Sequence, residues 1–276
     1  MEGLIYYNIG TKCLVRLAVS VSTAIRNFKG DITILADGDC FDKCFKIAKE
    51  FKVLIKNPRS DDFIGKNFAL LNKCRLHQIT PYSKTLFVDT DTLIMQDFSE
   101  CFKILDDYEF IVPQFCTWKS MDGHYRRRID LWKGFVSDEL MEHAFDESAA
   151  VNIGFYGWRA GAKIFDEWFN TALKNRQSFI PDEIACQILL PHYNHLILGS
   201  EYNTSCKHEA LTEKTKTLHY HGRKHCRVEN GQFLFHSDLW YQEFEKIRHL
   251  PCVYENIQFD RHLLKYLPEY EKCKPQ

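Results

Sequence analysis

Two aspartates one residue apart, Asp89 and Asp91, directly follow the apolar run at residues 86–88. A short run of this composition predicts a buried strand, and the alternation of a strand points both carboxylates to the same side. An unpaired charge beside an apolar core is costly, so the two carboxylates need a partner. Two hard oxygen ligands suit Mg²⁺ or Mn²⁺, which proteins often hold beside substrate phosphates. The alternative is an Asx turn at the end of a strand, which needs no ion.

A second group of polar side chains lies at residues 218–225, which contain three histidines, an arginine, a lysine and a glycine. An imidazole nitrogen is an acceptable Mn²⁺ ligand beside carboxylates. Gly222 lets the backbone approach a ligand closely, and Arg223 and Lys224 can balance the charge of a diphosphate. The alternative for this segment is a solvated basic loop after an edge strand.

Two further polar insertions interrupt apolar segments. Asn152 and Gly154 lie inside the apolar run at residues 149–158, where the alternative is a β-bulge satisfied by its own backbone. Asp182 and Glu183 open a predicted helix directly after a proline, where the alternative is a helix cap with an acidic first turn.

Strands alternate with helices along the first hundred residues. Strand patterns lie at residues 4–7, 31–36, 52–55 and 84–88, and helical patterns lie at 13–26, 41–51 and 67–79. This alternation is typical of an α/β protein with a mostly parallel sheet. Ligands bind beyond the carboxyl ends of such strands, so we expect Asn8, Asp37 and Asp89, which follow three of the strands, to line one mouth.

The second half of the chain is less regular. It shows strand patterns at residues 109–113, 149–158, 196–198 and 217–220, helical patterns at 160–174 and 182–190, and a polar helical tail from 233 onward. No proline-rich or glycine-rich linker divides the 276 residues, which favours one domain.

Composition and missing motifs exclude several classes of protein. A net charge of -1 gives no general attraction to nucleic acid or anionic membranes. The 11 cysteines contain no Cys-x-x-Cys pair, and no leader or membrane-spanning segment is evident, so we expect buried, reduced thiols in a cytoplasmic protein. No Gly-x-Gly-x-x-Gly follows the first predicted strand and no Walker sequence occurs, which argues against a dinucleotide-binding fingerprint or a P-loop.

The order of these motifs resembles family 8 of the glycosyltransferases, the retaining enzymes that include glycogenin and bacterial lipopolysaccharide galactosyltransferases. The family pattern begins with a lysine on a helix, a turn containing tyrosine, and a strand that ends in Asp-x-Asp-Thr. It continues with an Asn-x-Gly strand, an Asp-Gln helix start and a His-x-x-Gly-x-x-Lys-Pro-Trp loop. The corresponding positions here are Lys73, Tyr82, residues 89–92, 152–154, 182–183 and 219–224. The resemblance spans about residues 4–226 of this chain.

The chain departs from the family pattern at several positions. Ile153 replaces the usual small residue, and Glu183 replaces the usual glutamine. The lysine of the last loop comes one residue early, as Lys224, and the Pro-Trp pair is absent. These differences concern the donor and its diphosphate more than the class of reaction. The last 50 residues resemble no known motif.

The resemblance implies a GT-A-like fold, an α/β/α sandwich around a mostly parallel central sheet. It implies a single domain with a nucleotide-binding half (1–103), a sugar and acceptor half (104–230) and a helical tail (231–276). The implied activity moves a sugar from a nucleoside diphosphate sugar, expected to be a UDP-hexose, to an acceptor hydroxyl with retention of configuration. The implied cofactor is Mn²⁺ or Mg²⁺, and the acceptor would be a glycan, a lipid-linked molecule or a protein.

The resemblance also implies roles for individual residues. The metal ligands would be Asp89, Asp91 and His219, and the second histidine, His221, would not bind the metal. The remaining contacts to the nucleotide sugar would come from Tyr7, Asn8, Gly10, Lys73, Thr90, Asn152, Gly154, Gly222 and Lys224. Catalytic roles would fall to Asp182, Glu183 and Asn152. A front-face route and a double displacement both stay open. Residues 115–148, with Trp118, His124, Arg126–Arg128 and Trp132, would lie on the acceptor side.

Two other functions stay open at this point. A sugar-1-phosphate nucleotidyltransferase would normally carry a glycine-rich loop with arginine and lysine after the first strand, and residues 8–12 lack one. A non-catalytic nucleotide-sugar or glycan-binding protein on the same scaffold would have no need for the metal ligands. Hydrolysis of a sugar donor in the presence of Mn²⁺ would distinguish an enzyme from such a binding protein.

Overall fold

The computed structural model describes residues 1–58, 69–117, 124–147, 149–222 and 224–274. The chain divides into two compact units, each built from three separate stretches. The first unit contains Met1–Gly3, Pro58–Phe87 and Glu100–Tyr202, and the second unit contains Leu4–Asn57, Val88–Ser99 and Asn203–Gln276. Each unit is therefore completed by chain segments that are far apart in the sequence.

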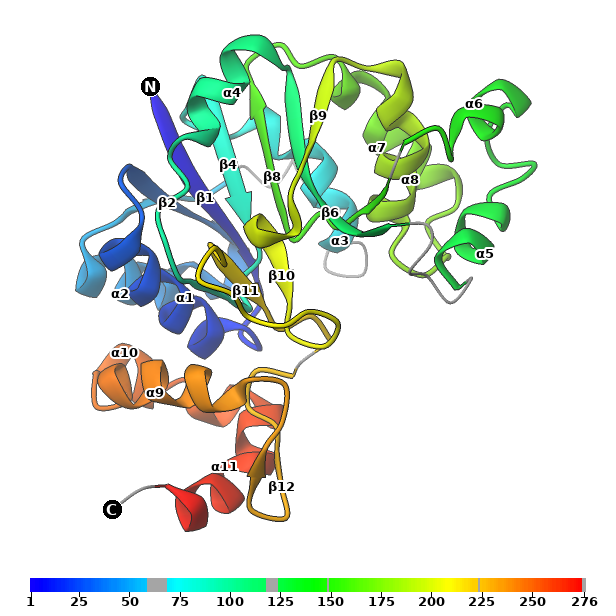
Figure 1. Ribbon diagram of the computed structural model, residues 1–276. Coiled ribbons are helices and arrows are strands. Elements are labelled where there is room, and N and C mark those ends of the chain that lie inside the picture. Colours follow the sequence, from blue (N-terminus) through cyan, green and yellow to red (C-terminus); the bar gives the residue numbers. More distant parts are fainter. Residues whose placement is uncertain (59–68, 118–123, 148, 223, 275–276) are drawn as a thin grey trace. The chain divides into compact units, whose positions relative to one another are not determined.

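The second unit begins with the alternating strands and helices that the sequence predicts. Its strands β1 (Glu2–Ile9), β2 (Asp31–Asp37) and β3 (Leu54–Lys56) lie in the order β3-β2-β1, and β2 pairs with β3 in parallel. Helices α1 (Leu14–Asn27) and α2 (Phe41–Phe51) connect these strands and are drawn in blue in Figure 1. Every residue of α1 from Leu14 to Ala24 is buried, including the polar residues Arg16, Ser20 and Thr23.

A small sheet in the same unit joins the middle of the sequence to its last third. It contains β5 (Thr92–Ile94), β10 (Thr204–Ser205) and β11 (Thr217–His219), in the order β10-β11-β5. Strand β10 runs parallel to β11, and β11 runs antiparallel to β5. Strands β5 and β11 have three residues each and β10 has two, so the small sheet depends on the packing of β5 against α1.

The C-terminal part of the second unit contains a short hairpin as well as helices. The hairpin strands are β12 (Val228–Glu229) and β13 (Gln232–Phe233), and the helices are α9 (Ser237–Ile247), α10 (Pro251–Tyr254) and α11 (Arg261–Cys273). The Tyr241 ring stacks on Tyr270 with 3.8 Å between centroids, and the Trp240 ring stacks on Phe244. The contact between Tyr241 and Tyr270 packs α9 against α11, whereas Trp240 and Phe244 both belong to α9.

The first unit contains a four-stranded arrangement in the order β4-β8-β6-β7, with β9 also paired to β6. The strands are β4 (Lys84–Val88), β6 (Phe110–Thr117), β7 (Ala149–Val151), β8 (Phe155–Arg159) and β9 (His195–Leu198). The helices are α3 (Ala69–Asn72), α4 (Cys101–Asp107), α5 (His124–Asp130), α6 (Asp138–His143), α7 (Ile164–Lys174) and α8 (Pro181–Leu189). Figure 1 shows α7 and α8 side by side. The core of the first unit is aromatic, with Tyr156, Trp158 and Trp168 fully buried.

Two predicted elements differ from the observed ones. The single strand expected at residues 149–158 is interrupted: β7 ends before Asn152, and β8 begins after Gly154. The Gly154 amide donates to the Asn152 side chain at 2.9 Å, a local turn that competes with strand pairing. The helix expected at 67–79 consists, within the described residues, of α3 followed by a 3₁₀ turn at Lys73–Gln78. No helix in the described parts of the chain is long and apolar enough to cross a bilayer.

Gly157 lies on β8, where the side chains of the first unit pack closely around it. A Cβ atom at this position would lie 2.6 Å from Leu86 Cδ2 and 2.9 Å from Ile111 Cγ1, so Gly157→Ala forces the core to shift. We expect a loss of about 1–3 kcal/mol in the free energy of unfolding, measured by urea denaturation. Gly199→Ala is the control, because its new methyl group meets only the flexible end of Glu201. Equal stabilities of the two variants would contradict the packing argument.

Candidate functional site

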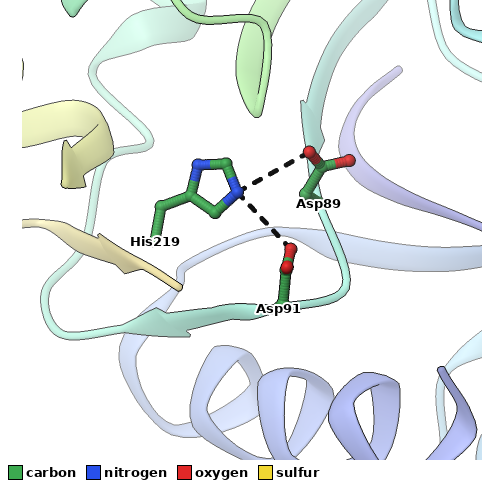
Figure 2. Close-up of side chains that lie close together, drawn as sticks. All are labelled: Asp89, Asp91 and His219. Atoms are coloured by element: carbon green, nitrogen blue, oxygen red, sulfur yellow. Dashed lines mark ion pairs between the residues drawn. The ribbon is translucent and has the colours of Figure 1, made fainter. Parts of the chain in front are cut away.

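Three potential metal ligands converge in the second unit. Asp89 and Asp91 lie in the turn between β4 and β5, and His219 is the last residue of β11. His219 Nε2 lies 3.4 Å from Asp91 Oδ1 and 3.8 Å from Asp89 Oδ2. Figure 2 shows the three side chains pointing toward one another. One ligand atom from each residue lies within 4.8 Å of the other two. The sequence therefore predicted three residues that the folded chain brings together.

Backbone pairing fixes this geometry. His219 lies opposite Thr92 in the antiparallel pair formed by β11 and β5, and the next amide, that of Tyr220, donates to the Asp91 carbonyl at 2.9 Å. The Thr92 hydroxyl donates to the Asp89 carbonyl at 2.8 Å and also contacts Ser20 Oγ on α1 at 2.9 Å. The turn that carries the two aspartates is thus anchored by main-chain and hydroxyl groups, and its carboxylates face the histidine.

Positive groups stabilise the ionised form of Asp91. Burial raises the pKa of this carboxyl, but the hydrogen bond and charge of His219 and the charge of Arg16 outweigh burial and hold the pKa below its ordinary value. Arg16 Nη1 lies 4.0 Å from Asp91 Oδ2. An ionised carboxylate is the form that binds a metal.

The donor set fits a divalent cation. Two carboxylates and one imidazole offer hard oxygen ligands with a single nitrogen, a combination suited to Mn²⁺ and acceptable to Mg²⁺. The side chain of His219 is 5% exposed and that of Asp91 is 16% exposed, so both are held within a packed environment. No other group of three such ligands occurs among the residues that the structure describes.

His221 has a different environment from His219. Its Nε2 lies 2.6 Å from the Ser205 hydroxyl, and its ring stacks on His208 with 5.9 Å between centroids. Burial lowers the pKa of His221 to about 3, which keeps the ring neutral. Lys224 Nζ donates to the His221 carbonyl at 3.1 Å, across Gly222, which has a positive φ of 70°. Arg223 lies outside the described residues.

Residues at the end of β1 form a second polar group in the second unit. The side-chain amide of Asn8 is buried and donates to the Gly10 carbonyl at 3.0 Å. Gly10 adopts a positive φ of 72°, a conformation that favours glycine, and Tyr7 is buried in the preceding strand. Thr90 lies between the two aspartates, in the turn that joins β4 to β5. Contact of these residues with a nucleotide stays a prediction.

The remaining predicted site residues belong to the first unit. The Asn152 amide donates to Glu183 Oε2 at 2.8 Å, so two of the three predicted catalytic side chains contact each other. Asp182, which precedes Glu183 in the sequence, is also buried, and its backbone carbonyl accepts a hydrogen bond from the Trp168 indole. Lys73 lies in the 3₁₀ turn, with its ammonium 5.3 Å from the centre of the Phe87 ring.

Asp182 is not the N-cap of α8, so the helix-cap alternative is wrong. The residue at the N-cap is Ile180, which has a positive φ of 48° and makes no side-chain capping bond. Asp182 and Glu183 instead occupy the first turn, where carboxylates interact favourably with the helix dipole. Favourable first-turn charge therefore remains the structural alternative to a catalytic role.

Several relevant residues escaped the sequence analysis. Gln187 accepts a hydrogen bond from the Val151 amide at 2.9 Å and so anchors β7 next to Asn152. Its position one helical turn after Glu183 was the available signal. Arg16 faces Asp91, and Asp260, the N-cap of α11, faces Arg16 at 3.3 Å. These two residues had no comparable signal, because no spacing rule links the first helix to the last one. Trp132, expected to face an acceptor, is fully buried and belongs to the core, and Trp118 lies outside the described residues.

Comparison by sequence finds no relatives: no protein-family model matches the chain, and neither does any curated protein. Comparison by structure does find similar proteins. The chain resembles galactosyltransferase LgtC, solved with donor and acceptor sugar analogs, at a TM-score of 0.60 and 12% identity, over 90% of this chain and 97% of that one. Mouse xyloside xylosyltransferase 1 gives 0.58 and 10% identity, over 80% and 98% of the two chains.

A third similar structure is the bifunctional glycosyltransferase WbbM, with a TM-score of 0.57 and 14% identity. The match covers 93% of this chain and 51% of WbbM, so this chain spans about half the length of that protein. All three similarities extend over most of the present chain. They confirm the expected α/β fold of the GT-A type, at identities too low to carry more than the fold.

Replacement of the two histidines distinguishes their roles. His219→Ala removes one of three converging ligands, so we expect Mn²⁺ affinity to fall at least about tenfold, roughly 1.4 kcal/mol. His221→Ala is the matched control and should change the affinity much less, because its Nε2 faces Ser205. Isothermal titration with Mn²⁺ measures both variants. The reverse ranking would show that the wrong histidine has been assigned to the metal.

Proposed function

We propose that the protein is a metal-dependent glycosyltransferase that moves a hexose from a UDP-sugar to an acceptor hydroxyl with retention of configuration. The observation that carries this proposal is the cluster of Asp89, Asp91 and His219, which lies beyond strand β4 in a chain with the fold of known sugar transferases. A bound divalent cation would neutralise the negative charge that develops on the departing diphosphate. The three side chains would hold that cation.

Fixed charges of the protein would assist the same step. Lys224 is partly buried beside the loop that follows His219, and Lys73 lies in the first unit. We propose that both ammonium groups bind oxygens of the diphosphate. Such preorganised positive charges act most strongly where water is excluded.

We propose that Asn152 and Glu183 bind the sugar of the donor. The hydrogen bond from the Asn152 amide fixes one oxygen of the Glu183 carboxylate, while the Asn152 oxygen is held by the Gly154 amide. A carboxylate oriented in this way can accept hydrogen bonds from sugar hydroxyls. It can also act as a nucleophile toward the anomeric carbon in a double displacement, in which two inversions give net retention. Asp182 is the second carboxylate available for these roles.

The acceptor side is proposed to include α5. Arg126 lies 4.9 Å from the centre of the Phe145 ring, and Arg128 lies 4.6 Å from that of Phe179. Guanidinium groups that stack on aromatic rings keep their hydrogen-bond donors available at the edge of the plane. This arrangement is suited to hydroxyl-rich or phosphorylated acceptors, whether glycan, lipid-linked or protein.

The first test of this function is its metal dependence. We expect transfer from a UDP-sugar to require Mn²⁺ or Mg²⁺ and to fall to background in EDTA, because the diphosphate would otherwise leave without charge compensation. A panel of UDP-sugars and GDP-sugars, screened by thermal shift with and without Mn²⁺, identifies the donor. Released UDP is then measured with that donor. Full activity in chelator would refute the role assigned to the metal cluster.

The two carboxylates of α8 are tested by amide substitution. Asp182→Asn or Glu183→Gln removes a negative charge while nearly preserving side-chain size. If either carboxylate orients or attacks the sugar, its amide variant should lose about 2 kcal/mol of transition-state stabilisation, about thirtyfold in rate.

Melting temperature and UDP affinity, measured on the same preparations, serve as controls for the two variants. If a first-turn carboxylate only interacts with the helix dipole, its replacement changes the free energy of unfolding by less than about 1 kcal/mol and leaves the rate of sugar transfer unchanged. If both variants transfer sugar at the wild-type rate, neither carboxylate of α8 belongs to the sugar site. An enzyme that cleaves the donor only in the presence of Mn²⁺ would also exclude a purely binding function.

A further inference from the structure

A chain of ionisable side chains leads from the three potential metal ligands to the start of the last helix of the protein. Asp91 faces Arg16 on α1, Arg16 faces Asp260, and Asp260 faces His225. The distances are 4.0 Å from Arg16 Nη1 to Asp91 Oδ2, 3.3 Å from Arg16 Nε to Asp260 Oδ2 and 3.6 Å from His225 Nε2 to the same oxygen. All of these residues belong to the second unit.

The two oxygens of Asp91 have different neighbours. Oδ1 faces His219 Nε2 at 3.4 Å, on the side of the metal cluster, whereas Oδ2 faces the Arg16 guanidinium. Groups that contact the second oxygen of a metal-binding carboxylate commonly set its orientation and its affinity for the ion. Arg16 is in a position to do this because its side chain is only 8% exposed and lies in the stretch of α1, from Leu14 to Ala24, in which every residue is buried.

Arg16 is itself fixed from two sides. Its Nη2 donates to the Lys12 carbonyl at 3.0 Å, and its Nε faces Asp260. Asp260, with a side chain 1% exposed, is the N-cap of α11 and accepts hydrogen bonds from the His262 and Leu263 amides, both at 3.1 Å. These two contacts hold the guanidinium in a fixed orientation beside Asp91.

The sign of the charges matters for a cation site. A lone arginine beside Asp91 would repel a divalent ion, and this repulsion is strong in a poorly solvated environment. Asp260 supplies the compensating negative charge, so the pair of Arg16 and Asp260 adds little net charge near the metal. Arginine can then orient Asp91 with little electrostatic cost to metal binding.

We infer that Arg16 and Asp260 are positioning residues of the metal site. Asp260, from the segment that resembles no known motif, holds Arg16, and Arg16 holds Asp91 so that Oδ1 is presented to the cation. This inference rests on the proposed metal-dependent function. It assigns to the C-terminal helix α11 a direct part in the geometry of a site whose ligands lie elsewhere in the chain.

The experiment measures Mn²⁺ affinity without any sugar donor. Asp260→Asn removes the charge but keeps the helix cap, because asparagine caps as well as aspartate. Arg16→Gln removes the group that contacts Asp91. The matched controls are Arg26→Gln, on the same helix but paired with Glu243, and Asp97→Asn, which accepts hydrogen bonds from the Lys29 and Ser99 amides. Isothermal titration and the paramagnetic resonance signal of free Mn²⁺ give the dissociation constants.

We expect each test variant to bind Mn²⁺ about tenfold more weakly than wild type, within the range typical of lost outer contacts to metal ligands. The two controls should bind like wild type. Melting temperatures in EDTA separate this effect from a structural one, because a merely structural role lowers stability and leaves the affinity of the folded protein unchanged. If Arg16→Gln does not fold, Asp260→Asn alone decides.

Two results would overturn the inference while leaving the proposed function intact. One is wild-type affinity in both test variants. The other is tighter Mn²⁺ binding by Arg16→Gln, which would show that the arginine competes with the cation. A wild-type protein that binds no Mn²⁺ would overturn the inference together with the proposed metal site.

Discussion

The antiparallel pairing of β11 with β5 is the constraint on which the candidate site depends. Three backbone pairs bring His219 beside the turn that holds Asp89 and Asp91, although the histidine and the aspartates come from distant parts of the sequence. Each of the two strands has only three residues, too few for independent stability. Packing of β5 on α1, and the hydroxyl contacts from Ser20 and Thr23, compensate for this shortness. The cluster of three potential metal ligands is thus a property of the folded second unit rather than of a local motif.

The buried helix α1 connects fold and site. Its apolar residues fill the core, while its polar side chains each have a defined partner: Ser20 contacts Thr92, Thr23 binds the Ile94 amide, and Arg16 faces Asp91 and Asp260. A buried arginine is acceptable only when its charge is compensated and its donors are used. Two carboxylates provide that compensation here, one from the turn after β4 and one from the N-cap of α11.

Local patterns predicted much of this structure, and the failures have physical causes. Helix α2 and strand β4 have the predicted boundaries because turn residues and hydrophobic periodicity agree there. The prediction of a single strand at 149–158 was wrong because the Asn152 side chain closes a turn that the hydrophobic pattern does not reveal. The hairpin of β12 and β13 was missed because its two-residue strands are too short to show alternation. At the site, motif spacing identified the three potential ligands, whereas Arg16 and Asp260 depend on tertiary pairing that no local pattern encodes.

The register of β11 has a consequence for how the chain can vary in length. Side chains alternate between the two faces of a strand, so an insertion of one residue within β11 would present Leu218 or Tyr220 where His219 now lies. The segment between β10 and β11 has no such restriction, because it is a connection outside the paired residues and longer loops have a modest entropic cost. Insertions and deletions should therefore accumulate between Cys206 and Lys216 and be excluded from the three residues that follow.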